Sequence, residues 1–190
     1  MEIESPGFTE QDLRAFFDEV VAYEKTRPRA GLTLVERLEV ASRRLEDAVR
    51  AMGPGGGRQP APDGGWTARE TLAHIVLVSQ VLGWATWAVA SGEQDEITIM
   101  SFLSLRDVAG EHFAKVSAKE LLEIAQSEHV ATIEYLCMAD AEALARRAKV
   151  GPFDLSAEEI GRLMLCAHIE LHIDQLMAAL GTPRRTEASA

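Results

Sequence analysis

Apolar residues recur at helical spacing along five segments of this chain, so that each segment has one apolar face. The segments cover residues 9–26, 33–52, 67–91, 117–138 and 156–180, and a short helical piece is expected at 101–115. No segment shows the alternation of apolar and polar residues, bounded by turn residues, that is typical of a β-strand. The pattern predicts an all-α protein.

Each of the five helices begins with the sequence of a capping box, a Ser or Thr followed three residues later by an acid. The pairs are Thr9/Asp12, Thr33/Glu36, Thr67/Glu70, Ser117/Glu120 and Ser156/Glu159. The last four helices are long enough for a four-helix bundle spanning 31–181, and the first is an N-terminal extension within 1–30. We expect the tail, 182–190, to be disordered. The glycine-rich stretch 53–65 lacks the G-K-[ST] of a phosphate-binding loop, so it is interpreted as a flexible connection.

Composition and charge narrow the class of protein. The chain has 190 residues, enough for one domain with a single core, and a formal net charge of −11, which disfavours nucleic acid as a partner. The aliphatic run 75–90 is broken by polar residues and is shorter than the roughly 20 residues of a membrane span. No signal peptide pattern opens the chain, so a cytoplasmic location is expected. Cys137 and Cys166 are then expected to be buried and reduced.

Two of the five histidines, His168 and His172, lie four positions apart in the last helix and so share a face. This spacing allows half of a metal site, but also two ordinary histidines that bond neighbouring groups. It is not the H-E-x-x-H motif of a zincin, because Ile169 follows His168 and the nearby acid, Glu170, lies about 200° around the helix. His74, two turns into the third helix, shares the apolar face of that helix; taken alone, it could be a core histidine.

Taken together, these stretches form a pattern: W-[ST]-x-x-E-x-x-x-H at the start of one bundle helix and H-x-x-x-H-x-x-Q-[LI] in the last. The residues that carry it are Trp66, Thr67, Glu70 and His74, then His168, His172, Gln175 and Leu176. Over about 33–180 the chain resembles the DinB/YfiT-like superfamily of metal-binding four-helix bundles, and VGPFDLSAEE resembles that family's connection into the last helix. The resemblance implies that His74, His168 and His172 form a facial three-histidine site for a divalent metal, most simply zinc or nickel. The helix at 9–26 falls outside it.

A three-histidine site leaves coordination positions open, as catalytic zinc sites do. The resemblance implies a metal-dependent thiol S-transferase, which joins a low-molecular-weight thiol to an electrophile in detoxification or stress, and a homodimer. Two alternatives stay open: a metal-dependent hydrolase, and a non-catalytic, metal-stabilised, stress-associated binding protein. Whether the chain is an enzyme, and which residues would be catalytic, is left undecided.

The remaining candidate residues receive weaker roles. Glu70, Glu128 and Tyr135 could line the site, without an assigned catalytic role. His112 and His129 are expected at the surface, because polar residues near helix ends are usually exposed. Trp84 and Trp87 lie in an apolar helix and are expected to pack in the core or in a dimer interface.

Overall fold

The computed structural model describes residues 10–26, 32–58, 66–98, 113 and 115–181. Its long helices are α1 (Glu10–Thr26), α2 (Leu34–Met52), α3 (Ala68–Ser91) and α5 (Ala118–Met138). A continuous C-terminal helix follows, made of α7 (Ala157–Glu159), the π-helical segment η2 (Ile160–Ala167) and α8 (His168–Ala179). The short elements are η1 (Gly53–Gly55), α6 (Ala141–Ala145), β1 (Glu96–Ile97), β2 (Arg147–Val150) and β3 (Phe153–Ser156). The helical piece expected at 101–115 and the tail at 182–190 fall almost wholly outside the described residues.

Four of the five predicted capping boxes open helices at the expected positions. Thr33 Oγ1 accepts a hydrogen bond from the Glu36 N–H at 3.2 Å, and Glu36 Oε2 accepts one from the Thr33 N–H at 2.7 Å. The same reciprocal pair forms between Thr67 and Glu70, Ser117 and Glu120, and Ser156 and Glu159. The fifth box begins at Thr9, which lies outside the described residues. These local bonds satisfy backbone N–H groups of the first helical turn, so nearby sequence sets where the helices begin.

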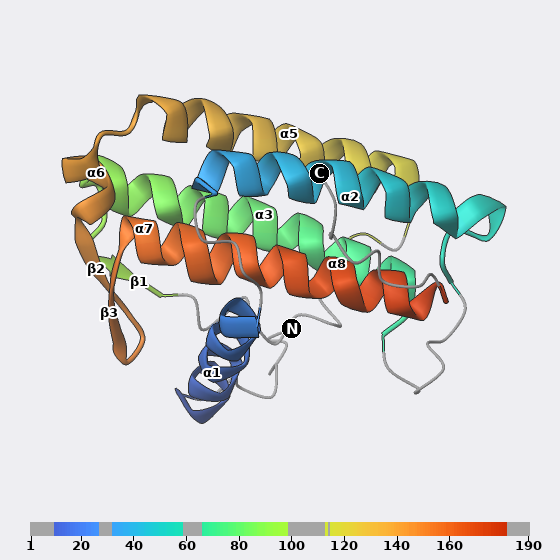
Figure 1. Ribbon diagram of the computed structural model, residues 1–190, viewed down its shortest axis with the longest axis horizontal. Coiled ribbons are helices and arrows are strands. Elements are labelled where there is room, and N and C mark those ends of the chain that lie inside the picture. The colour runs from blue at the N-terminus through green and yellow to red at the C-terminus, as the bar shows by residue number, and fades with distance from the viewer. Residues whose placement is uncertain (1–9, 27–31, 59–65, 99–112, 114, 182–190) are drawn as a thin grey trace, which may run out of the picture.

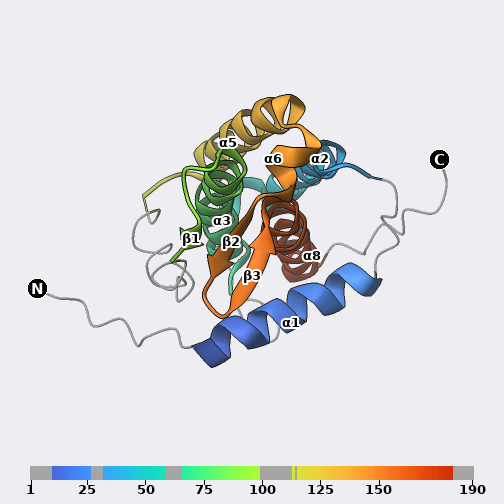
Figure 2. The ribbon, with the colours of Figure 1, turned by 90° about the vertical axis from the view of Figure 1, so that its left-hand side faces the viewer.

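The bundle consists of α2, α3, α5 and the C-terminal helix, which run side by side (Figure 1). α2 and α3 are consecutive in the chain, yet each packs against α5 and against the C-terminal helix. They therefore occupy opposite corners of the bundle (Figure 2). A chain that crosses the end of a bundle diagonally needs a long connection. The connection between α2 and α3 includes the glycine-rich stretch 53–65, of which the structure describes 53–58.

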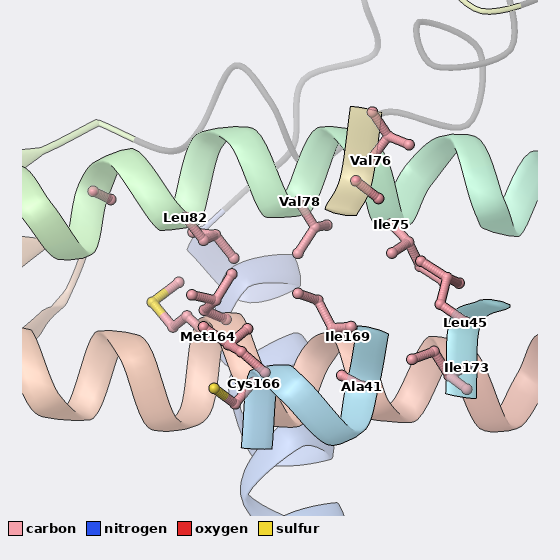
Figure 3. Packing of buried hydrophobic residues seen from close by; sticks show 14 of the residues in the cluster. Ala41, Leu45, Ile75, Val76, Val78, Leu82, Met164, Cys166, Ile169 and Ile173 are labelled. Atoms are coloured by element: carbon pink, nitrogen blue, oxygen red, sulfur yellow. The ribbon is translucent and has the colours of Figure 1, made fainter. Parts of the chain in front are cut away.

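The core is built around α3, most of whose residues are buried. Ile75, Val78 and Leu82 face the C-terminal helix, where Met164 and Ile169 meet them (Figure 3). α3 is long and apolar enough to cross a membrane by length and composition, and 72% of its most apolar window is buried inside the protein. The core helix of a folded domain passes the same test. The helix therefore serves as the centre of the bundle core.

The C-terminal helix differs from the single regular α-helix expected over 156–180. Its middle, Ile160–Ala167, is π-helical, and the regular α-helical pattern resumes at His168. π-helical turns are rare and occur often at functional sites. The periodicity of apolar residues could not show this, because it marks a helical face without specifying which backbone carbonyl each N–H bonds. The π segment ends directly before the first histidine of the H-x-x-x-H pair.

The expectation that the chain has no strand is wrong in one place. β1, β2 and β3 form a small sheet, with β1 parallel to β2 and β2 antiparallel to β3. β2 and β3 are joined by Gly151 and Pro152, and Gly151 has φ 56°, a conformation that favours glycine in a tight hairpin. Strands of two to four residues are too short to show an alternating pattern in sequence. The sheet caps one end of a bundle that is otherwise all-α, as predicted (Figure 1).

Candidate metal centre

Three histidines from two helices of the bundle meet at one point. His74 comes from α3, and His168 and His172 come from α8. The Nε2 atoms of His74 and His168 lie 3.3 Å apart, and those of His168 and His172 lie 2.8 Å apart. The three ligand-type nitrogens all lie within 4.8 Å of one another. The structure thus brings together the three residues that the sequence motif singles out, although 94 positions separate His74 from His168.

All three rings are held in the neutral form. Burial lowers the pKa of His74 to about 3 and that of His172 to about 4. Burial also lowers the pKa of His168 well below its ordinary value, and the neighbouring imidazoles add to this effect. A neutral imidazole has one nitrogen lone pair free to bind a metal, whereas a protonated one has none. At neutral pH the cluster is therefore a set of three nitrogen ligands.

The tautomer of His172 is set by a hydrogen bond. Gln175 Oε1 lies 2.7 Å from His172 Nδ1 and can only accept, so this Nδ1 carries the proton and Nε2 carries the lone pair. The Nδ1 atoms of His74 and His168 are buried and form no hydrogen bond of ordinary geometry among the described residues. The Met164 carbonyl, one turn before His168, acts to raise the pKa of that ring, although by less than burial lowers it.

The spacing of the Nε2 atoms fits a bound cation. Three imidazole nitrogens that each lie about 2.0–2.1 Å from one zinc ion are about 3–3.4 Å apart. The separations of 2.8 and 3.3 Å are close to this range. Without a cation, nitrogen lone pairs would face one another in a buried place unless ring protons were shared among them. The cluster therefore suggests a divalent metal ion, held by the Nε2 atoms of His74, His168 and His172.

Two aromatic rings from outside the four bundle helices flank the cluster. Trp66, directly before the Thr67 cap of α3, lies edge-on to His74 with ring centroids 4.9 Å apart, and parallel to His172 at 6.1 Å. Phe16, from α1, lies 4.5 Å from His168 between ring centroids. Each of the three histidine rings therefore contacts an aromatic ring, whether it comes from α3 or from α8. Apolar surroundings of this kind strengthen electrostatic interactions within the site.

The model of the DinB superfamily matches residues 37–176, which include all three histidines. The chain belongs to the DinB superfamily. Its fold is similar to that of YfiT from Bacillus subtilis, a solved structure described as a probable metal-dependent hydrolase with an unusual four-helix bundle topology. The two share 19% sequence identity with a TM-score of 0.62, over 83% of this chain and 94% of that one. A search of curated protein sequences found no match.

In this DinB-superfamily protein, Glu170 is not part of the histidine cluster, in agreement with its expected position on the helix. It is fully buried and accepts hydrogen bonds from Arg37 at 2.9 and 3.2 Å. Arg37 also forms a bidentate pair with Glu24 of α1, at 2.8 Å for both bonds. The acid between the two α8 histidines therefore joins α8 to α2 and, through Arg37, to α1. This placement is consistent with the sequence motif, which excludes the chemistry of a zincin.

The three residues expected to line the site, Glu70, Glu128 and Tyr135, have other contacts in the structure. Glu70 is half-buried, and its Oε2 accepts the Thr67 N–H at 2.8 Å in the capping box. Glu128, on α5, lies 3.4 Å from Gln80 Nε2. Tyr135 is partly buried against the main core, and burial raises the pKa of its phenol. Among the described residues, no carboxylate joins the three histidines within the distance that groups them.

The prediction that His129 lies at the surface is wrong: its side chain is 1% exposed. Ser42 Oγ lies 2.6 Å from its Nδ1, and Ser79 Oγ lies 2.9 Å from its Nε2. Ser79 donates its own proton to the Ile75 carbonyl, so it accepts from Nε2–H, while Ser42 donates to Nδ1. These partners come from α2 and α3, and the sequence of α5 gives no sign of them. His112 lies outside the described residues.

One further expectation is wrong, and for Trp84 one of two alternatives is excluded. Cys137 was expected to be buried but is exposed near the end of α5, whereas Cys166 is buried as expected. Trp84 is 50% exposed, so it does not pack in the core of this chain, and Trp87 is partly buried. Both α3 and α5 are apolar over much of their length, so apolar neighbours in sequence could not distinguish the buried face from the outer one.

Proposed function

We propose that this protein is a metal-dependent enzyme, with a zinc or nickel ion held by His74, His168 and His172. The observation that carries the proposal is the convergence of three neutral imidazoles without a fourth ligand-type side chain among the described residues. Structural zinc sites have four protein ligands, whereas catalytic sites have three and an open position. A divalent ion bound in this way acts as a Lewis acid and lowers the pKa of a water or thiol that binds beside the histidines.

The residues of this chain have three roles in that scheme. The imidazoles are neutral ligands, so the site keeps the full positive charge of the ion for the fourth ligand. Gln175 orients the His172 ring through its Nδ1–H. Trp66 and Phe16 cover the rings with apolar surface and limit access of water to them. Together these features favour an anionic nucleophile in a site that is largely apolar.

The reaction that we propose first is S-transfer from a low-molecular-weight thiol to an electrophile. The thiol sulfur forms a bond to an electrophilic carbon, the leaving group departs with the bonding electrons, and the thiol proton passes to solvent. This chemistry needs no carboxylate base once the thiol is ionised, which agrees with the absence of a carboxylate from the group of three histidines among the described residues. It is also the activity that resemblance to some DinB/YfiT-like proteins implies.

Hydrolysis is the second candidate, and the description of YfiT as a probable metal-dependent hydrolase favours it. A hydrolase would use bound hydroxide as the nucleophile and would benefit from a nearby base. Glu70 and Glu128 are the acids to substitute first. Glu70 holds the N-terminus of α3, so Glu70→Gln keeps the size of the side chain while removing its charge.

The experiment compares both reactions in one preparation. Zinc-loaded and nickel-loaded protein is assayed with a panel of thiols and monochlorobimane, and separately with a panel of esters and amides. Metal-dependent transfer of thiol, lost in His74→Ala, supports the first candidate; metal-dependent hydrolysis that falls in Glu70→Gln or Glu128→Gln supports the second. If neither panel shows turnover and removal of the metal greatly lowers the melting temperature, the protein is instead a metal-stabilised binding protein, and the proposal is wrong.

A further inference from the structure

Helix α1 lies outside the segment that matches the DinB superfamily. The match begins at residue 37, whereas α1 ends at Thr26. α1 nevertheless packs against η2 and α8, the helix that carries two of the three histidines. Figure 2 shows it crossing beneath the bundle, alongside β3 and α8. The family resemblance assigns it no role, so its role has to come from its contacts.

Polar contacts fix α1 to the outer side of α8. The Tyr23 hydroxyl donates a hydrogen bond to the Asp174 carboxylate at 3.0 Å, and the same carboxylate forms an ion pair with Arg44 of α2 at 2.6 Å. Glu24 binds Arg37, which also binds Glu170. Glu170 and Asp174 lie four positions apart on α8, each two positions after one of the two histidines. Two positions correspond to about 200° around the helix, so the acids point away from the histidine pair. Both acids are buried, so these bonds are shielded from water and hold α1 in one position.

Apolar contacts fix the other part of α1. Phe17 stacks on Phe153 of β3 with ring centroids 4.3 Å apart. Val20 is fully buried with Leu163 and Ala167 of η2. The helix is therefore held in its middle by the hairpin and by the π-helical segment that leads into His168, and toward its C-terminal end by the buried acids.

Phe16 is the residue of α1 that reaches the histidine cluster. Its ring lies 4.5 Å from the His168 ring between centroids, at an interplanar angle of 56°. His168 is 2% exposed, and its Nδ1 has no hydrogen bond of ordinary geometry among the described residues. Its ring orientation thus depends more on packing than that of His172, which Gln175 holds through a hydrogen bond.

We propose that α1 is part of the metal site, with Phe16 as a positioning residue that holds the His168 imidazole toward the ion and closes that side of the site to water. The inference rests on metal binding by the three histidines, as in the proposed function, but not on which reaction the site catalyses. Small molecules would then approach from the sides that Phe16 leaves open. Trp66 borders the other two rings in a similar way.

Cobalt(II) binding tests the inference without an activity assay. The variants are Phe16→Ala, Phe16→Leu and, as a matched control on the same helix, Phe17→Ala, each checked for helical content. The dissociation constant is measured by competition with a chelator, and the visible absorption of cobalt reports the ligand geometry. Phe16→Ala is expected to raise the dissociation constant about tenfold, the lower end of the effect of outer-shell partners, and to shift the absorption bands. Phe16→Leu should recover most of the affinity, because it keeps an apolar contact with the ring.

Phe17→Ala removes an aromatic ring of the same size from α1 but not from the site. The contacts of Val20, Tyr23 and Glu24 still hold the helix in this variant, so its cobalt affinity should stay within about twofold of the wild type. If Phe16→Ala binds cobalt as the wild type does, or if Phe17→Ala weakens binding as much, Phe16 has no positioning role, and the proposed function stands. If the wild-type protein binds no cobalt, zinc or nickel, the proposed function is wrong and this inference fails with it. The two failures are distinguished in the wild type, before any variant is compared.

Discussion

Gln175 Oε1 lies 2.7 Å from His172 Nδ1, one helical turn away on α8. The amide oxygen can only accept a hydrogen bond, so the bond places the imidazole proton on Nδ1 and leaves the lone pair on Nε2, which faces His168 and His74. Burial keeps this ring neutral, with a pKa of about 4. One exposed glutamine therefore decides which nitrogen of His172 is available as a ligand.

Replacing Gln175 with Leu is expected to weaken metal binding while leaving the fold intact, because the side chain is exposed. Outer-shell partners of metal-bound histidines are typically worth 10–100-fold in affinity, and an exposed partner should lie near the lower end, about tenfold. Gln175→Glu keeps an acceptor at the same place and should bind metal at least as well as the wild type. Zinc competition with a chelator measures both. Equal losses in the two variants would contradict a role through the acceptor oxygen.

The metal content of the protein should depend on the three clustered histidines and not on the total number of histidines. Protein purified without an affinity tag is expected to contain a stoichiometric divalent metal, which His74→Ala and His168→Ala lose. His129→Gln is the matched control, since His129 is equally buried but bonded to Ser42 and Ser79. Elemental analysis of the four proteins measures the result. Unchanged metal content in both cluster variants would show that the ion, if present, is bound elsewhere.

The stability of the protein should fall in acid partly because of His129. The unfolded ring takes up a proton below a pKa of about 6.5, whereas burial lowers the pKa of the folded ring to about 4. The unfolded state therefore binds more protons between these values, and the free energy of unfolding decreases as the pH falls from about 6.5 to 4. The contribution of this one site is about 3 kcal/mol.

His129→Gln removes that contribution but keeps a side chain able to bond to serine. Urea unfolding in the presence of a chelator is measured for both proteins from pH 7 to pH 4. The stability advantage of the wild type over the variant should shrink as the pH is lowered, while the three clustered histidines titrate alike in both. An advantage that does not change with pH would argue against a buried, neutral His129.

Replacing only one partner of the buried ion pair between Arg37 and Glu170 should strongly lower the free energy of unfolding. Arg37→Met removes the guanidinium that Glu170 and Glu24 share and is expected to lower the free energy of unfolding by about 3–5 kcal/mol. Adding Glu170→Leu should recover part of this loss, because the buried charge is then gone as well. Arg50→Ala, which breaks an exposed pair with Glu46, should change stability by less than about 1 kcal/mol. Chemical denaturation measures all three.

The homodimer implied by family resemblance remains a prediction, and Trp84 is the residue with which to test it. Its side chain is 50% exposed although it lies in the most apolar helix of the bundle. If a second copy covers this face, Trp84→Glu should raise the dimer dissociation constant by at least about tenfold. Leu32→Glu, at an exposed apolar residue two positions before α2, is the control. Sedimentation equilibrium that shows a monomeric wild type would exclude the dimer.

Local signals in the sequence were sufficient for most helix boundaries. A capping box involves only residues three positions apart, so Thr33 with Glu36 and Ser117 with Glu120 could be recognised before any tertiary contact was known. The same holds for the partners of His172 within α8, since Gln175 is three residues away. By contrast, His129 and Cys137 were placed wrongly, because burial depends on which neighbouring helix covers each face.

The sequence by itself determined the bundle helices, the family and the three histidines, because each depends on residues that are close together in the chain. Capping boxes and apolar faces indicate the helices, and the H-x-x-x-H pair with its following glutamine is part of the family motif. Only the tertiary structure decided that the three Nε2 atoms converge, that α2 and α3 sit diagonally, and that α1 reaches the site through Phe16. Phe16 and His168 are 152 positions apart. A contact between residues so far apart depends on how helices pack against one another, and the periodicity along one helix does not predict that packing.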